Sequence, residues 1–191
     1  MFNLSAVILA GGESSRMGQD KGLMRLQGKT MVEHVADRFA VANQLLINSE
    51  NDAYEKLGFD LISDIHHPDV AKQAGPLMGI YSGLKLAKHD WVIFSPCDTP
   101  FIPQNYIEKM CQTASDQLAK ACVVFDGERQ QNLHILLHNS HADGLLMYLL
   151  SGRRKTYEWL DSIKAQQVYF TDLPSAFDNI NTPEDFAAYS K

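Results

Sequence analysis

The sequence contains few cysteines and no long apolar run. Its three cysteines, Cys97, Cys111 and Cys122, lie too far apart for a C-x-x-C metal or redox pair, and their odd number suits a reducing compartment. No apolar stretch reaches the roughly 18 residues of a membrane-spanning helix. The run Ala6–Ala10 is too short for a signal peptide and has no basic segment before it. We therefore expect a cytoplasmic protein that does not bind a membrane.

Positive charge is also scarce. The chain has 17 lysines and arginines against 23 aspartates and glutamates, which gives a formal net charge of −6. This balance argues against electrostatic binding of nucleic acid, so any phosphate site must be local. Repeats, low-complexity tracts and linkers are missing, and 191 residues that are 45% hydrophobic suit one domain, residues 1–191, with one substantial core.

Short apolar runs bounded by turn residues predict strands, and stretches with helical spacing lie between them. The predicted strands are Ala6–Ala10, Gln44–Asn48, Trp91–Ser95, Ala121–Phe125, Leu133–Leu137 and Gln167–Phe170. The predicted helices are one from Met31 behind a Thr30/Glu33 capping box, then Leu77–Ala87, Pro103–Leu118, His141–Leu150, and one opened by Thr182 and Pro183. This alternation predicts an α/β fold whose mainly parallel sheet is covered on both faces, with ligands beyond the carboxyl ends of strands.

The segment Gly22–Thr30, GLMRLQGKT, is similar to a Walker A phosphate loop but does not match it. Five residues rather than four separate its glycines, and it follows a polar loop instead of a buried strand. We interpret Leu23–Leu26 as a short strand, Gln27–Lys29 as its turn and Thr30 as the helix cap.

The segment Leu9–Gly22, LAGGESSRMGQDKG, directly follows the first predicted strand. Gly11 and Gly12 allow consecutive backbone amides to turn toward an anion, while Arg16 supplies a planar cation and Lys21 a point charge. A surface loop with incidental cations is the alternative. If the loop instead binds an anion through its amides and these two cations, it predicts a site for a polyphosphate.

Asp98 lies in SPCDTPFIP, Ser95–Pro103, just after the apolar run Trp91–Phe94. A carboxylate there is costly unless it is solvated, caps a helix or binds a cation, and the flanking prolines stiffen its loop. One carboxylate together with phosphate oxygens is the usual way in which proteins hold Mg²⁺. A turn or cap aspartate is the alternative, but next to a polyphosphate loop Asp98 predicts a Mg²⁺–triphosphate site.

With GPLMGI (Gly75–Ile80) and DNINTPED (Asp178–Asp185), these strings closely resemble the molybdenum cofactor guanylyltransferases, from Ala6 to Phe186. The resemblance implies a Rossmann-like three-layer α/β/α fold and transfer of GMP from GTP to the phosphate of Mo-molybdopterin. GTP and Mo-molybdopterin are the implied partners, with cofactor-delivery proteins or apo-molybdoenzymes as further candidates. Three alternatives stay open: a molybdopterin cytidylyltransferase, another small-molecule nucleotidyltransferase, and a non-catalytic nucleotide-binding protein of this fold.

The resemblance also implies the roles of individual residues. The nucleotide-binding residues are Leu9, Ala10, Gly11, Gly12, Lys21, Asn48, Asp64, Gly79 and Asp98. Catalysis would depend on Arg16, Lys21 and Asp98, with Asp98 as the Mg²⁺ ligand. The acceptor-binding candidates are Asn179, Asn181 and Arg154, the last from the basic segment GRRK. Each weaker candidate has a local structural role as its alternative. Asn48 and Asp64 could lie in strand-edge turns, and Gly79 could belong to a simple helix entry. Asn179 and Asn181 could satisfy backbone groups beside a helix start, and Arg154 could be a solvated charge at a helix end.

Overall fold

The computed structural model describes residues 3–11, 20–70 and 75–189. Gly12 and Arg16 of the predicted phosphate loop lie outside the described residues, so their roles stay predictions. Among the helices that the structure describes, none is long and apolar enough to cross a membrane.

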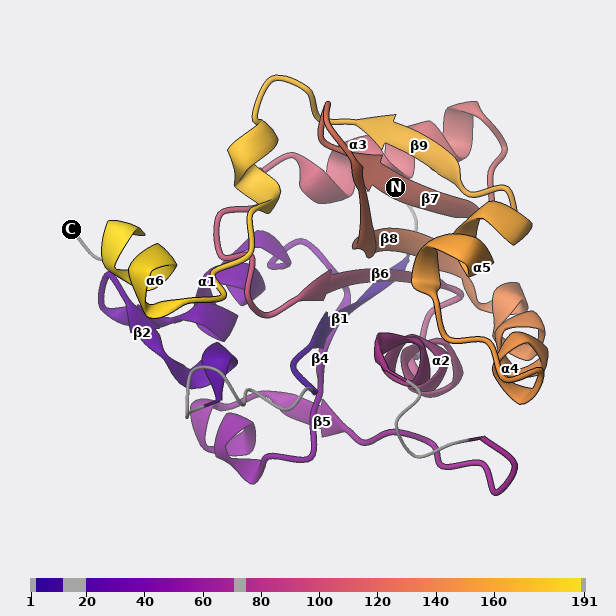
Figure 1. Cartoon of the computed structure of the whole chain (residues 1–191), viewed down its shortest axis with the longest axis horizontal. Helices are drawn as coiled ribbons and strands as arrows, with labels where there is room; N and C mark the ends of the chain where they lie inside the picture. The colour runs from indigo at the N-terminus through magenta and orange to yellow at the C-terminus, as the bar shows by residue number, and fades with distance from the viewer. Residues whose placement is uncertain (1–2, 12–19, 71–74, 190–191) are drawn as a thin grey trace.

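A seven-stranded sheet forms the centre of the protein, in the order β5-β4-β1-β6-β8-β7-β9 (Figure 1). Its strands are β1 (Leu4–Leu9), β4 (Gln44–Asn48), β5 (Asp60–Ile62), β6 (Trp91–Pro96), β7 (Ala121–Phe125), β8 (Gln130–His138) and β9 (Gln166–Tyr169). β8 runs antiparallel to β6 and β7, because the short connection from β7 allows only a hairpin, and the other neighbouring pairs are parallel. The prediction of a mainly parallel sheet is confirmed.

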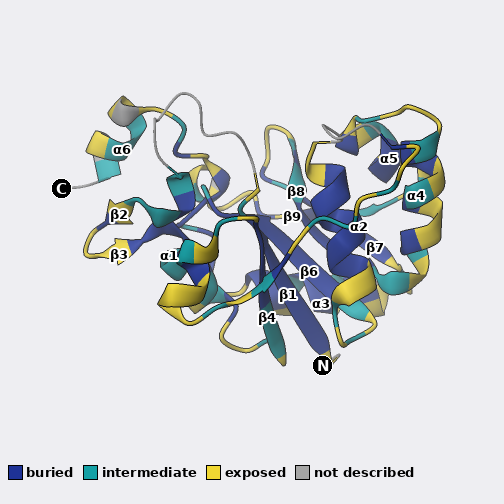
Figure 2. Ribbon diagram, turned by 90° about the horizontal axis from the view of Figure 1, so that it is seen from below, coloured by how far each residue is buried: buried dark blue, intermediate teal, exposed yellow. Residues whose placement is uncertain are grey.

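Helices cover both faces of this sheet. One face is covered by α2 (Pro76–Leu86), α4 (Ala142–Leu150) and α5 (Thr156–Ser162), the other by α1 (Met31–Arg38) and α3 (Tyr106–Asp116). In β1, Val7 and Leu9 face the first group and Ala6 and Ile8 the second, as the two-residue repeat of a strand requires. The strands are buried and the outer helix surfaces exposed (Figure 2). The three-layer α/β/α arrangement is confirmed.

The segment similar to a Walker A loop forms a hairpin. Strands β2 (Arg25–Leu26) and β3 (Lys29–Thr30) pair across Gln27 and Gly28, whose positive φ values of 49° and 88° form the tight turn. The predicted strand Leu23–Leu26 is wrong in its first half, since Leu23 ends a 3-10 turn, η1 (Lys21–Leu23). The Thr30/Glu33 capping box of α1 is confirmed.

β8 leaves the sheet for a short stretch near its beginning. Val123 of β7 pairs with Ile135, but the next residue, Val124, pairs with Gln131. The residues between them on β8, Asn132–His134, have no partner on β7, and the pairing of β8 with β6 ends at Ile135. Such irregularities redirect side chains out of a sheet, often beside a functional site.

Candidate active site

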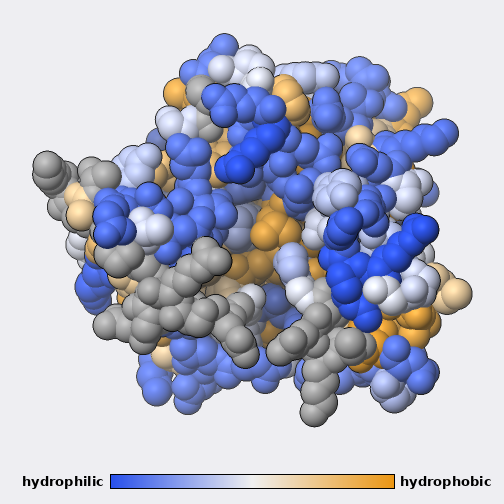
Figure 3. Space-filling view, viewed as in Figure 1, coloured by the Kyte–Doolittle hydropathy of each residue, from blue (hydrophilic) through white to orange (hydrophobic). Residues whose placement is uncertain are grey.

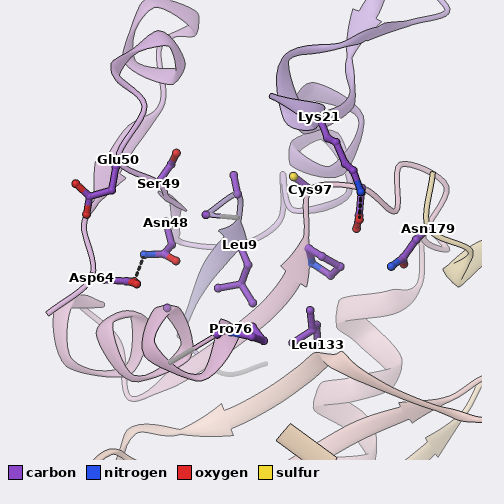
Figure 4. A pocket seen from close by; sticks show the side chains of 16 residues that line it. Leu9, Lys21, Asn48, Ser49, Glu50, Asp64, Pro76, Cys97, Leu133 and Asn179 are labelled. Atoms are coloured by element: carbon purple, nitrogen blue, oxygen red, sulfur yellow. Dashed lines mark hydrogen bonds and ion pairs between the residues drawn. The ribbon is translucent and has the colours of Figure 1, made fainter. Parts of the chain in front are cut away.

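A pocket opens at the carboxyl ends of β1, β4 and β6, against the first turn of α2 (Figure 4). In the sheet order, β1 lies between β4 and β6, so the winding of the chain reverses there. Open α/β sheets bind ligands at this position. On the surface, hydrophobic residues lie at the centre of this face between hydrophilic ones (Figure 3).

Backbone of the segment after β1 forms one side of the pocket. Leu9 accepts a hydrogen bond from the Cys97 amide at 3.1 Å, and the Ala10 amide donates to Asn48 at 3.0 Å. These bonds extend the sheet by one residue on each side, so Leu9, Ala10 and Gly11 enter the pocket as a fixed stretch of chain. The structure therefore brings the described residues of the predicted loop to the expected position.

Asn48, Asp64 and Gly79 form a contiguous cluster in the pocket. The Asn48 side-chain amide donates to Asp64 Oδ1 at 3.0 Å and to the Ile62 carbonyl at 3.3 Å, which links the ends of β4 and β5. A Cβ at Gly79 would lie 2.2 Å from Asn48 Oδ1, so only glycine allows α2 to approach so closely. The structure brings these three predicted residues together.

The first turn of α2 faces the same pocket. Gly75 precedes the helix with φ 67° and ψ −160°, a conformation open to glycine, and Pro76 occupies the first turn without a side-chain cap on the helix. Gly75, Pro76 and Gly79 line the pocket. Uncapped amides at a helix start favour anions.

Lys21 and Asp98 meet at the opposite side of the pocket. Lys21 Nζ donates to Asn181 Oδ1 at 2.6 Å and lies 3.7 Å from Asp98 Oδ2. The Ile180 amide donates to the Asp98 carbonyl at 2.8 Å, so the segment around Asn181 is attached directly to the loop after β6. Both charged side chains are largely buried, with 19% of Lys21 and 16% of Asp98 exposed.

The Asp98 carboxylate lacks a partner for one oxygen. Oδ1 is buried and has no hydrogen bond among the described residues. Burial raises the pKa of Asp98 above its usual value, and the nearby Lys21 charge opposes this rise. A buried, under-satisfied carboxylate beside an open pocket is suited to a cation. The described residues contain no cluster of three or more His, Cys, Asp or Glu for a metal, so phosphate and water would complete its coordination.

Asp20 fixes the position of Lys21, a role that the sequence did not predict. Its carboxylate accepts hydrogen bonds from the Gly22 amide at 3.1 Å, Asn51 Nδ2 at 2.9 Å and Tyr54 Oη at 2.5 Å. A Cβ at Gly22 would lie 2.3 Å from Tyr54 Oη. The one signal in the sequence is that Asp20 precedes Lys21 in the string DKG.

Five further lining residues were not predicted: Ser49, Glu50, Pro96, Cys97 and Leu133. The first two follow Asn48 at the end of β4, and Leu133 belongs to the displaced part of β8, which no turn residue marks. Burial raises the pKa of Cys97, which disfavours the nucleophilic thiolate form.

Of the three predicted acceptor-binding residues, two lie at the site and one does not. Asn179 lines the pocket and Asn181 binds Lys21, so both reach the site. Arg154 lies between α4 and α5, where its guanidinium donates to the carbonyls of Leu149 at 2.6 Å and Arg153 at 2.5 Å. The structure does not place Arg154 among the residues that line the pocket.

Comparisons with known proteins agree with this geometry. The family model described as "MobA-like NTP transferase domain" matches residues 6–167. The molybdenum cofactor guanylyltransferase of Yersinia pseudotuberculosis serotype O:1b is 41% identical over 187 residues, covering 96% of this chain and 93% of the relative. The same protein from Yersinia pestis is 40% identical over the same shares.

Solved structures share the fold. The molybdopterin-guanine dinucleotide biosynthesis protein A of Archaeoglobus fulgidus superposes with a TM-score of 0.79 at 23% identity, covering 97% of this chain and 96% of that one. The 4-diphosphocytidyl-2C-methyl-D-erythritol synthase of Anaerococcus prevotii gives 0.68 at 13% identity, covering 98% and 94%. These likenesses concern the fold alone, whereas the sequence matches reach further. The chain belongs to the molybdenum cofactor guanylyltransferases, in the family of MobA-like NTP transferase domains.

Proposed function

We propose that this protein transfers GMP from GTP to the phosphate of Mo-molybdopterin, forming the molybdopterin guanine dinucleotide and pyrophosphate. Family membership supports this reaction. The observation that carries it is the buried Asp98 carboxylate, whose Oδ1 has no partner among the described residues and whose Oδ2 lies 3.7 Å from Lys21 Nζ. A cation and a polyphosphate would satisfy both charged groups.

The residues present fit a Mg²⁺ ion. Asp98 would hold it through the unpartnered oxygen, which matches the preference of Mg²⁺ for one or two carboxylates plus phosphate and water. When bound, the ion neutralises negative charge on the triphosphate.

The bond changes need no general base. An acceptor phosphate oxygen forms a bond to the α-phosphorus of GTP, and the bond from that phosphorus to the pyrophosphate oxygen breaks. Because a phosphate monoester is largely ionised at neutral pH, its oxygen attacks without losing a proton. Lys21, held by Asn181, would stabilise the charge that develops on the phosphates, and we assign the same role to Arg16.

We assign the nucleotide to the side of the pocket formed by Leu9–Gly11, Gly75, Pro76 and Gly79. Asp64 supports guanine at the far end. Its carboxylate accepts hydrogen bonds only, and the guanine N1–H and N2–H₂ groups donate them, whereas cytosine presents acceptors along most of this edge. The acceptor would then enter past Asn179.

The test is a direct assay of the reaction. The protein is incubated with Mg²⁺, Mo-molybdopterin and either GTP or CTP, and pyrophosphate and dinucleotide are quantified, with Asp98→Asn as the inactive control. We expect equal amounts of both products from GTP. Product from CTP instead would identify a cytidylyltransferase, and GTP binding without pyrophosphate release would identify a non-catalytic protein.

We also propose that residues 1–191 form one nucleotidyltransferase domain, because the central sheet draws its strands from residues 4 to 169. A cytoplasmic location is proposed as well. The three cysteines are free and buried, which suits a reducing compartment.

A further inference from the structure

A second depression adjoins the nucleotide pocket. Besides Pro96 and Asn179, it is lined by the consecutive segment Arg129–His134, which we call the β8 segment. Pro96, Leu133 and Asn179 line both depressions and form the wall between them. A ligand that lies along the β8 segment therefore reaches the phosphate side of the pocket past Asn179.

Hydrogen bonds to Asp126 hold the β8 segment in place. Asp126 Oδ1 accepts hydrogen bonds from the amides of Glu128 and Arg129, each at 2.8 Å, and Oδ2 accepts from Gln131 Nε2 at 2.6 Å. Asp126 is buried, and its three bonds fix the loop that precedes the displaced stretch. A preorganised segment of this kind reduces the entropy cost of binding a ligand.

The side chains of this segment suit a planar polar ring. Arg129 is exposed, and its guanidinium makes no hydrogen bond or ion pair with any residue in the described ranges. Arg129 lines both this depression and a third one, which Asn179 and Asn181 also line. It can stack on a ring or donate to ring nitrogens and carbonyl oxygens. Gln130 Nε2 donates to Asn132 Oδ1 at 2.8 Å, which leaves the Gln130 side-chain carbonyl oxygen and the Asn132 amino group for a ligand.

His134 closes the segment. It is only 1% exposed, and its ring packs edge-on against Phe177 and Tyr106 with centroid distances of 5.0 and 5.9 Å. Its Nδ1 lies 3.3 Å from Ser95 Oγ, but its buried Nε2 has no partner among the residues described. His134 lines a depression whose other lining residues are polar apart from Pro96 and Leu133, and an unpartnered polar atom on such a residue indicates a ligand-binding position.

We propose that the β8 segment is the subsite for the heterocyclic ring of the acceptor, with the Arg129 guanidinium as its main contact and Asp126 as a positioning residue. This inference rests on the proposed function, which supplies a pterin as the acceptor's ring. It assigns recognition of that ring to β8, separately from Asn179 and Asn181, which lie nearer the reacting phosphate.

Steady-state kinetics with Arg129→Gln test the proposal. We expect the KM for Mo-molybdopterin to rise about tenfold, the usual effect of losing a charged hydrogen bond, while the KM for GTP stays unchanged. Lys120→Gln is the matched control, because it removes one exposed positive charge just before β7, at the opposite end of the β7–β8 hairpin from Arg129. Arg154→Gln tests the rival position, and an increase in acceptor KM there but not at Arg129 would overturn the proposal.

Asp126→Asn tests the positioning role. It should raise the KM for the acceptor with little change in the KM for GTP, whereas a purely structural role would lower stability and affect both substrates equally.

A second measurement does not depend on turnover. Free pterin, 2-amino-4-oxopteridine, is titrated against the wild type and Arg129→Gln, and binding is followed by its fluorescence. Weaker binding by the variant supports the subsite even if no dinucleotide forms. Equal binding by both proteins, or no binding to the wild type, overturns it. Failure of the proposed function itself would show instead as a wild type that binds pterin but releases no pyrophosphate from GTP.

Discussion

The side of the pocket next to β1 and the start of α2 consists mainly of backbone and glycine, whereas the side next to β8 consists mainly of polar side chains. The first, which we call the donor wall, is formed by Leu9–Gly11, Gly75, Pro76 and Gly79. The second is the β8 segment, Arg129–His134. Backbone amides bind phosphates, which all nucleotides have in common. Polar side chains can instead recognise one heterocyclic ring and exclude others. Asp98 and Lys21 lie where the two sides meet.

The largest effect on turnover should come from Asp98. We expect Asp98→Asn to reduce turnover by about a hundredfold or more, because it removes the proposed metal ligand. The variant should also unfold at a higher temperature without ligands. Burial raises the pKa of Asp98, so the ionised carboxylate destabilises the fold above its usual pKa, and a neutral amide removes that cost. Turnover assays and thermal denaturation decide both points, and near-normal turnover would contradict the metal assignment.

Lys21 should be nearly as sensitive. We expect Lys21→Met to lower turnover about a hundredfold, since the phosphates lose their positioned cation. Asn181→Ala keeps the charge but removes the 2.6 Å bond that orients it, so a smaller loss of about tenfold is expected. Rates at saturating GTP give the measurement. Equal losses in the two variants would mean that Asn181 has a role of its own with the acceptor.

Gly79→Ala tests the donor wall alone. The new Cβ would lie 2.2 Å from Asn48 Oδ1, so Asn48 must move and break its link to Asp64, at about 1–3 kcal/mol of stability. We expect the KM for GTP to rise about tenfold or more, with the acceptor KM unchanged. Gly144→Ala is the control, since a Cβ there meets nothing within 4 Å and should stabilise α4. A larger effect on acceptor KM would contradict the division between the two sides.

The last effect concerns the β8 side, and it changes stability only as the pH changes. Burial lowers the pKa of His134 to about 3, while an unfolded chain has a histidine pKa of about 6.5. Between these values the unfolded state binds more protons, so stability falls as the pH decreases. Relative to His134→Phe, the wild type should lose about 2 kcal/mol of unfolding free energy between pH 7 and pH 5. Urea denaturation at both pH values measures this, and parallel losses would show that His134 is protonated in the fold.

Local patterns explain which elements the sequence predicts. β1, β4 and β6 are continuous apolar runs that end at turn residues, and the Thr30 capping box and the Thr182 cap, whose hydroxyl accepts from the Asp185 amide at 3.1 Å, are short-range signals. β5, with three residues, and α5, with seven, are too short to show a periodic pattern, and both were missed.

Contacts across long sequence separations explain what the sequence does not predict in the site. Asp20 and Tyr54 are 34 positions apart, and nothing local in either string indicates their bond. The displaced stretch of β8 contains neither glycine nor proline, so its departure from the sheet has no marker in the sequence. Arg154 has the right charge for an acceptor site, but charge does not reveal that the carbonyls of Leu149 and Arg153 already bind it.

The hydrogen bond from Lys21 to Asn181 joins positions 160 residues apart. The ribosome makes the final strand of the sheet, β9, before it makes Asn181, so a nascent chain can complete its central sheet while Lys21 still lacks its orienting partner. A chain halted shortly after residue 170 would contain every strand of the central sheet, but it would lack Phe177 of the core and Asn181, so Lys21 would be held without its orienting partner.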